Sequence, residues 1–429
     1  MIVPVLLLYS TFIFSQVKDA SFFIGDALPD APALSARGAY KVGVRTLVFL
    51  HTNQVDILRS KQGSDTVYNR PLKVEIWYPA LVPKRKKELE TYHSFLGLKN
   101  DSTRPLTPFS FNGRSLRNAE PDAAAGKCPL IIVSHGYPGS RLLLTYLTEN
   151  LASKGYVVAA IEHTESTYSD RSAFQSTLLN RAKDILFILN QLADLSTNNS
   201  NHFLNGMADA DNTGLIGYSM GGYGVLNAAG AGYSEKLVTA FSQMTGGSNA
   251  IKVRTTHNEE FKSSYDKRIK AIVAFAPWGM KLGLWDADGL AGLKVPSFFV
   301  SGSLDDVSGH ETGTKAIYNG AVNSDRYLLT YINARHNIAP NPPPAETLKP
   351  GAPFDNYYHY AEPSWNEYRI NNINQHFVTA FLGKILKQKM YNEFLDVPSN
   401  SNEKTWPGFK ARTSTGLELI HAAAKEKSE

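Results

Sequence analysis

Short apolar runs recur along the chain and alternate with segments of helical apolar spacing. Runs of this length, bounded by turn residues, are typical of strands buried on both faces of a sheet. We expect such strands at 129–134, 156–161, 212–216, 270–276, 295–302 and 326–332. Helical spacing lies near 140–154, 181–192, 222–229 and 373–386. This alternation predicts an α/β fold with a mostly parallel sheet and helices on both faces.

Polar segments interrupt the alternation and predict insertions into one large domain. Two early strands, at 42–52 and 72–78, are expected to pair antiparallel at the sheet edge. We place the domain at 17–395 and a tail at 396–429, which either wraps the domain or is partly mobile. Loop insertions are expected at 81–127, 231–268 and 337–365. The last insertion is rich in proline and aromatic residues, which predicts either a lid or acyl wall, or simple surface packing.

The stretch from Gly217 to Gly221, Gly-Tyr-Ser-Met-Gly, carries the strongest chemical signal. It follows a strand-like run and precedes a helix start, which is the setting of a nucleophile elbow. A serine at such a turn has a strained backbone and an exposed hydroxyl. We therefore expect Ser219 to be a catalytic nucleophile. The alternative is an ordinary Gly/Ser turn.

A serine hydroxyl needs a base to take its proton and an acid to orient that base. After an elbow of this type the order along the chain is Asp or Glu, then His. Asp305 and His336 follow two successive apolar runs, at positions where parallel strands would end. The sequence predicts Asp305 as the acid and His336 as the base. Asp306 could exchange roles with Asp305, and His310 is a weaker candidate for the base.

Backbone N–H groups must also stabilise the negative charge that develops on a substrate oxygen. One donor is expected from Met220, the residue after the nucleophile. The other is expected from the turn at 135–140, which follows an earlier apolar run, and we assign it to Tyr137. The alternative is an ordinary Gly/Pro turn between a strand and a helix.

With these residues in order, the chain resembles the α/β-hydrolases. Residues 129–163, with a His-Gly turn and a Val-Ala-Ala-Ile-Glu-His run, are similar to platelet-activating-factor acetylhydrolases and dienelactone-hydrolase-like proteins. The resemblance extends over residues 38–390. It implies an α/β-hydrolase fold and a serine hydrolase that cleaves carboxylic esters through an acyl-enzyme. The implied substrates are short-acyl or small lipid esters, and no cofactor is implied.

A second resemblance is to cutinase-like polyester hydrolases, through Gly136-Tyr137, the elbow Ser219-Met220-Gly221-Gly222 and Ala276-Pro277-Trp278. It implies that Tyr137 and Trp278 bind the substrate on either side of the ester, and a polymer substrate is favoured if their rings face each other across an open groove. Core packing is the alternative for Trp278. The greater length, the insertions and the single cysteine, Cys128, depart from this family and favour a small ester over a polymer.

Composition narrows the remaining classes of function. A net charge of +5 over 429 residues, without a patterned basic helix, predicts no nucleic-acid partner. Since a P-loop and a G-x-G-x-x-G motif after a strand are both missing, no nucleotide cofactor is expected. His135, His163 and His336 follow three different strands, as this fold places them without a metal, so no metal site is predicted. A non-catalytic binding protein on a hydrolase fold is the alternative of another class.

Residues 2–14 form an apolar run before Ser15, too short to cross a bilayer. It resembles the core of a signal peptide, although a basic segment before it is missing. We expect a signal peptide at 1–16 and a secreted or periplasmic protein, with no integral membrane segment after its removal. A buried N-terminal strand is the alternative.

Overall fold

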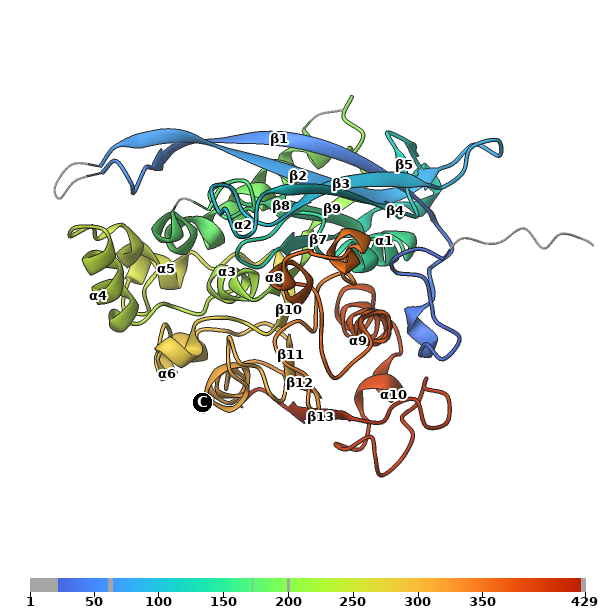
Figure 1. Cartoon of the computed structure of the whole chain (residues 1–429). Helices are drawn as coiled ribbons and strands as arrows, with labels where there is room; N and C mark the ends of the chain where they lie inside the picture. Colours follow the sequence, from blue (N-terminus) through green and yellow to red (C-terminus); the bar gives the residue numbers. More distant parts are fainter. Residues whose placement is uncertain (1–21, 61–64, 172, 199–200, 426–429) are drawn as a thin grey trace, which may run out of the picture.

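The computed structural model describes residues 22–60, 65–171, 173–198 and 201–425. The apolar run at 2–14, and with it the expected signal peptide, lies outside these residues. No helix of the described ranges is both long and apolar enough to cross a membrane. These residues form one large mixed sheet covered by helices, with a long two-stranded ribbon along one edge (Figure 1).

The central sheet has the strand order β13-β12-β11-β10-β9-β7-β8-β2-β1-β5, with β6 beside β2. Strands β8, β7, β9, β10, β11 and β12 pair parallel, whereas β1, β2 and β13 join antiparallel at the edges. Every residue of β7, β11 and β12 is buried, as expected for parallel strands covered on both faces. The strands are β1 Lys41–Val55, β2 Val67–Leu81, β5 Leu116–Arg117, β6 Glu120–Pro121, β7 Cys128–Ser134, β8 Val157–Glu162, β9 Ala208–Tyr218, β10 Ile269–Phe275, β11 Ser297–Gly302, β12 Arg326–Tyr331 and β13 Leu417–Ala422.

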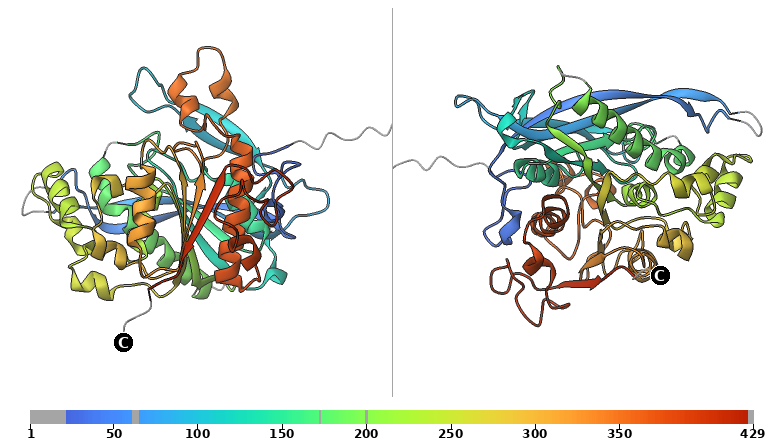
Figure 2. Two further views of the ribbon diagram at one scale, coloured as in Figure 1. Left: turned by 90° about the horizontal axis from the view of Figure 1, so that it is seen from below. Right: turned by 180° about the vertical axis from the view of Figure 1, so that it is seen from behind.

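Helices cover the two faces of this sheet, each face over its own apolar cluster (Figure 2). On one face lie α1 (Thr145–Ser153) and α9 (Glu367–Lys387). On the other face lie α2 Phe174–Thr197, α3 Met220–Ala228, α4 Glu235–Met244, α6 Ala287–Ala291 and α7 Lys315–Gly320. The predicted α/β-hydrolase fold, mostly parallel with helices on both faces, is confirmed.

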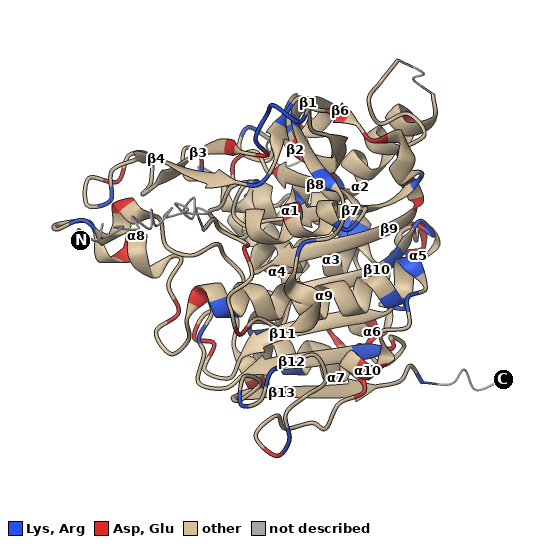
Figure 3. Ribbon diagram, turned by 90° about the vertical axis from the view of Figure 1, so that its right-hand side faces the viewer, with Lys and Arg blue, Asp and Glu red and all other residues tan. Residues whose placement is uncertain are grey.

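The segment at 81–127 contains a hairpin where the sequence predicted a loop. Strands β3 (Glu90–Leu96) and β4 (Thr107–Gly113) pair antiparallel in a separate two-stranded sheet. From Thr91 onward the residues of β3 alternate between exposed and buried, so that Tyr92 packs inward while Phe95 faces solvent. This alternation is the pattern of a half-buried strand. The hairpin extends from beside β2, where Tyr92 contacts Trp77, toward α8 (Phe354–Tyr358) (Figure 3).

The other polar segments also contain regular structure. Residues 231–268 hold α4 and the short helix α5 (Glu259–Ser263). The tail contributes β13, which pairs with the whole length of β12 and buries Leu417 and Leu419. The helix α10 (Asn392–Leu395) follows α9 closely. The segment from 396 onward therefore completes one edge of the central sheet.

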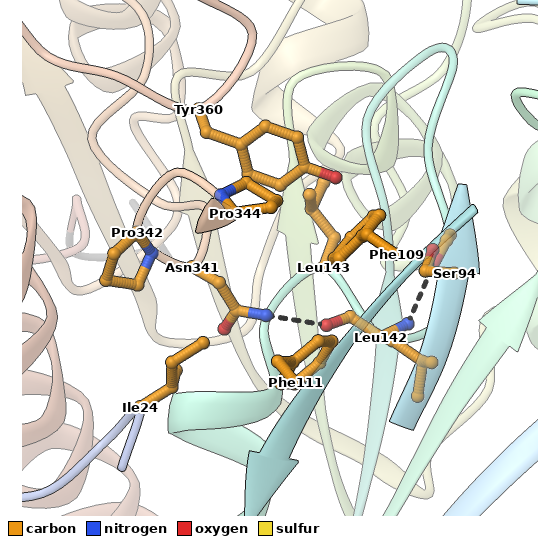
Figure 4. A pocket seen from close by; sticks show the side chains of 11 residues that line it. Ile24, Ser94, Phe109, Phe111, Leu142, Leu143, Asn341, Pro342, Pro344 and Tyr360 are labelled. Carbon is orange, nitrogen blue, oxygen red and sulfur yellow. Dashed lines mark hydrogen bonds between the residues drawn. The ribbon is translucent and has the colours of Figure 1, made fainter. Parts of the chain in front are cut away.

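The hairpin and the segment at 337–365 pack against each other. Arg104, in the hairpin loop, donates through Nε to Asn356 Oδ1 at 3.1 Å. A largely apolar pocket lies where the two segments meet the start of α1, and the Asn341 side chain crosses to the Leu142 carbonyl at 2.8 Å (Figure 4). Its lining comes from several segments: Ile24, Ser94, Phe109, Phe111, Ser140, Leu142, Leu143, Asn341, Pro342, Pro344 and Tyr360. The two insertions thus brace one another beside the sheet's carboxyl edge.

Candidate active site

Ser219 lies on a sharp turn between β9, which ends at Tyr218, and α3, which begins at Met220. Its backbone has φ 54° and ψ −113°, a conformation that a residue with a side chain rarely adopts. The Ser219 amide donates to the Phe275 carbonyl of β10 at 2.9 Å, which fixes the turn to the sheet. The structure thus holds the Ser219 hydroxyl at the carboxyl edge of the sheet in a strained elbow.

The glycines around Ser219 are required by close backbone contact. A Cβ on Gly217 would collide with the backbone of Gly221, on the other arm of the turn. A Cβ on Gly221 would collide with the carbonyl of Ser134, at the end of β7. These contacts explain why the first and last positions of the elbow motif are glycines.

Ser219, His336 and Asp305 form a continuous chain of hydrogen bonds. His336 Nε2 lies 2.9 Å from Ser219 Oγ, and His336 Nδ1 lies 3.0 Å and 3.1 Å from the two carboxylate oxygens of Asp305. Because an ionised carboxylate only accepts hydrogen bonds, Nδ1 carries the proton, and Nε2 of the neutral ring then accepts from the serine hydroxyl. This is the arrangement that activates a serine by general-base catalysis.

Asp305 is held ionised at the end of β11. Burial alone would raise the pKa of Asp305, but His336 and two backbone amides together outweigh it. The amides of Val307 and Ser308 each donate to Oδ1 at 2.9 Å and add to this effect. The pKa of Asp305 is therefore below its ordinary value, so the carboxylate can orient the imidazole.

The two alternative residues, Asp306 and His310, take no part in the hydrogen bonds that join Ser219, His336 and Asp305. Asp306 is exposed and pairs with Arg335 at 2.8 Å. His310 Nδ1 lies 3.2 Å from Ser301 Oγ, and His310 makes no hydrogen bond to Ser219. The geometry thus favours Asp305 over Asp306 and His336 over His310.

The turn after β7 approaches the nucleophile closely. A Cβ built on Gly136 would lie 3.6 Å from the Cβ of Ser219. The amides of Tyr137 and Met220 donate no hydrogen bond to another described residue. Two N–H donors beside a serine hydroxyl match what an oxyanion requires. Tyr137 follows Gly136 in the turn that approaches Ser219, and Met220 begins α3 directly after Ser219, so both residues lie next to the elbow.

A buried arginine, Arg181, supports the turn after β7 through hydrogen bonds. Arg181, on α2, donates to the His135 carbonyl at 2.7 Å and contacts Ser166, whose carbonyl accepts from Gly139 N at 3.1 Å. The sequence analysis placed Arg181 on a helix but assigned it no role. An arginine within a helix of apolar spacing could have indicated a buried ion pair or hydrogen bond, because a charged residue is seldom fully buried without a partner.

A second buried network continues from the turn. His163 bridges Ser134 Oγ, 2.9 Å from Nε2, and Asp184, 2.9 Å from Nδ1. Asp184 also accepts two hydrogen bonds from Arg70, at 2.9 Å and 3.0 Å. Burial lowers the pKa of His163 to about 3, so its ring is neutral in the folded protein. His163, which follows the strand expected at 156–161, therefore acts as a structural link between Ser134 and Asp184.

Three aromatic rings lie beside the elbow. The Trp278 amide donates to the Ser219 carbonyl at 3.1 Å, and Trp278 and Tyr137 are both half-buried. Phe174 lies between them, with ring centroids 5.3 Å from Tyr137 and 5.6 Å from Trp278. The sequence analysis missed Phe174, because nothing in the local pattern connects the start of α2 with two distant loops.

The segment at 337–365 contacts Tyr218, the residue before Ser219. Asn337 Nδ2 donates to the Ala361 carbonyl at 3.1 Å, and its Oδ1 accepts from Tyr218 Oη at 3.0 Å. Burial lowers the pKa of His359 to about 4, so its ring is neutral in the folded protein. The segment is thus anchored at Tyr218, the residue before the predicted nucleophile, as a wall of the site would be.

Among the described residues, no group of three or more His, Cys, Asp or Glu side chains is arranged to hold a metal ion. Cys128 is free and buried.

Comparison with known proteins gives two kinds of similarity. A family model described as PET hydrolase-like matches residues 112–257, which include the oxyanion turn and the elbow. Cutinase est1 from Thermobifida alba is 26% identical over 49% of this chain and 54% of its own length. Cutinase 2 from Thermobifida cellulosilytica is 22% identical over 50% of this chain and 62% of its own length. The chain therefore spans little more than half the length of these curated relatives.

Among solved structures, a ferulic acid esterase from Streptomyces cinnamoneus matches 89% of this chain and 96% of its own, with a TM-score of 0.54 and 19% identity. This likeness concerns the fold. Together with the cutinase similarity and the strand order of the sheet, it identifies the chain as a member of the α/β-hydrolase superfamily with cutinase-like features.

Proposed function

We propose that the protein is a serine hydrolase that cleaves carboxylic esters through an acyl-enzyme. The observation that carries this proposal is the hydrogen-bonded chain from Ser219 through His336 to Asp305 on a strained elbow. Similarity to cutinases and to a PET hydrolase-like family supports the ester as the bond that is cleaved.

In the proposed reaction, Ser219 Oγ attacks the acyl carbon while His336 Nε2 takes its proton. The amides of Tyr137 and Met220 stabilise the oxyanion, and Asp305 stabilises the imidazolium. The protonated His336 then donates to the leaving alcohol, and the tetrahedral intermediate collapses to the acyl-enzyme. Water, activated by the same histidine, attacks the acyl carbon and releases the acid and the free serine.

The comparisons favour the cutinase-like interpretation over the acetylhydrolase-like one, because the curated relatives are cutinases. We therefore place the activity among cutinase-like ester hydrolases. Trp278 and Tyr137 beside the elbow would border the substrate. Export is part of the proposal on the apolar run at 2–14 alone. Secreted protein that starts near Val17 would support it, and intracellular protein that retains Met1 would contradict it.

Ester hydrolysis by purified protein tests the proposal directly. We expect p-nitrophenyl acetate to be cleaved by the wild type and by Ser110→Ala, which alters an exposed serine of β4. Ser219→Ala should lose about 10⁴-fold or more in kcat, since the nucleophile is removed. Equal activity in wild type and Ser219→Ala would overturn the proposal. Folded wild-type protein that cleaves no ester of an acyl series would favour a binding protein.

A further inference from the structure

Phe174 occupies the space between the two aromatic side chains that border the nucleophile. Its ring meets Tyr137 at 70° and Trp278 at 89°, both edge-to-face contacts. Edge-to-face packing is a favourable arrangement of aromatic rings. The rings of Tyr137 and Trp278 therefore each contact a third ring, which takes up space that an open groove for a polymer would need.

Phe174 is held on a helix that is itself fixed to the site. It is the first residue of α2, and Arg181, two turns further along α2, binds the His135 carbonyl at 2.7 Å. Tyr223 on α3 donates to the Leu178 carbonyl of α2 at 2.9 Å. Because α2 is tied to both the turn after β7 and the elbow helix, the backbone of Phe174 is fixed relative to these elements. Phe174 is thus a wall of the site.

In the proposed reaction, the acyl part of the substrate is the part nearest this wall. The Tyr137 amide would bind the acyl carbonyl oxygen, so the acyl chain would lie next to the Tyr137 ring. Phe174 contacts the Tyr137 ring directly. An acyl group longer than a few atoms would therefore meet the Phe174 ring as it leaves the carbonyl carbon.

We propose that Phe174 is a specificity-determining residue that limits this enzyme to esters of small acyl groups. The inference rests on the proposed function, since it concerns the substrate of the same site. Acetyl esters fit beside the wall, whereas a benzoyl group or a polyester unit must displace the Phe174 ring. Removing that ring should open the space between Tyr137 and Trp278.

The test compares p-nitrophenyl benzoate with p-nitrophenyl acetate, which share one leaving group. Phe174→Ala should raise the benzoate-to-acetate ratio of kcat/KM by about tenfold or more, because a pocket that gains several atoms of space changes discrimination on this scale. Phe174→Trp should lower the ratio below that of the wild type. Phe187→Ala is the matched control, since Phe187 lies on the same helix and stacks on His51 away from the elbow.

A ratio in Phe174→Ala that stays within twofold of Phe187→Ala would overturn the inference. Phe174→Leu provides a further measurement if the alanine variant unfolds, as judged by circular dichroism, and should give an intermediate ratio. Failure of the proposed function is distinguishable, because wild-type protein would then cleave neither ester above the level of Ser219→Ala.

Discussion

Asp305 and Asp306 are neighbours in sequence, but only Asp305 is placed to orient His336. Asp305 is buried and bonded to His336, whereas Asp306 points to solvent and pairs with Arg335. The sequence favoured Asp305 but left Asp306 as an alternative, because both follow the same strand. The separation comes from the turn after β11, where the amides of Val307 and Ser308 hold only the first carboxylate inward.

Asp305→Asn should lower kcat for p-nitrophenyl acetate by about 10⁴-fold, because an amide can favour the wrong tautomer of the histidine. Asp306→Asn is the matched control and should change kcat by less than about threefold, since an exposed ion pair contributes little. Steady-state kinetics of both variants would decide. Similar losses in the two variants would contradict the assignment of Asp305.

At this scale the sequence led directly to residues with local motifs. Ser219 and its glycines stand in a contiguous pattern, and His336 follows in the expected chain order. Phe174 and Arg181 could not be found in this way, because their partners are distant along the chain. Contacts of that kind depend on how α2 packs on the sheet, which a single sequence does not state.

The hairpin formed by β3 and β4 shows the same limit at the level of elements. The parallel strands were predictable because continuous apolar runs are unambiguous, and the fold class is confirmed. Tyr92, Ser94 and Leu96 form the buried face of β3, but the segment around them is rich in polar residues. The sequence therefore predicted a loop there. In the tail, Leu417 and Leu419 alternate in the same way and form β13.

Tyr92 and Phe95, on opposite faces of β3, provide a matched test of this hairpin. Tyr92 Oη accepts from Trp77 Nε1 and donates to Glu149 Oε1, each at 2.7 Å, in a buried network. Tyr92→Ala should lower the free energy of unfolding by about 3–5 kcal/mol. Phe95→Ala should change it by no more than about 0.5 kcal/mol, because the ring is exposed. Urea unfolding would measure both, and equal effects would contradict the register.

Buried neutral histidines couple the stability of the whole molecule to pH. Burial lowers the pKa of His163 and His376 to about 3, and it lowers the pKa of His135 well below its ordinary value. The unfolded chain binds these protons below about pH 6.5, whereas the fold excludes them. The stability they allow is therefore complete above that pH and is lost as the pH falls toward 3.

The melting temperature should accordingly fall steadily between pH 7 and pH 4. Each such histidine costs up to about 1.4 kcal/mol for every pH unit below 6.5. His376→Gln should make this fall less steep, whereas His93→Gln, at an exposed position of β3, should leave the slope unchanged. Differential scanning calorimetry would measure it. A melting temperature that is constant over this range would contradict the linkage.

The three residues of the hydrogen-bonded chain lie at the ends of β9, β11 and β12, with β10 between the first two. Ser219 and His336 are 117 residues apart in sequence. Contacts of such long sequence separation form late and slowly during folding. In a refolding experiment, ester hydrolysis would therefore recover with the assembly of the central strands. The fluorescence change that reports early collapse would come before the recovery of ester hydrolysis. The time at which hydrolysis recovers would therefore report when the central sheet is complete.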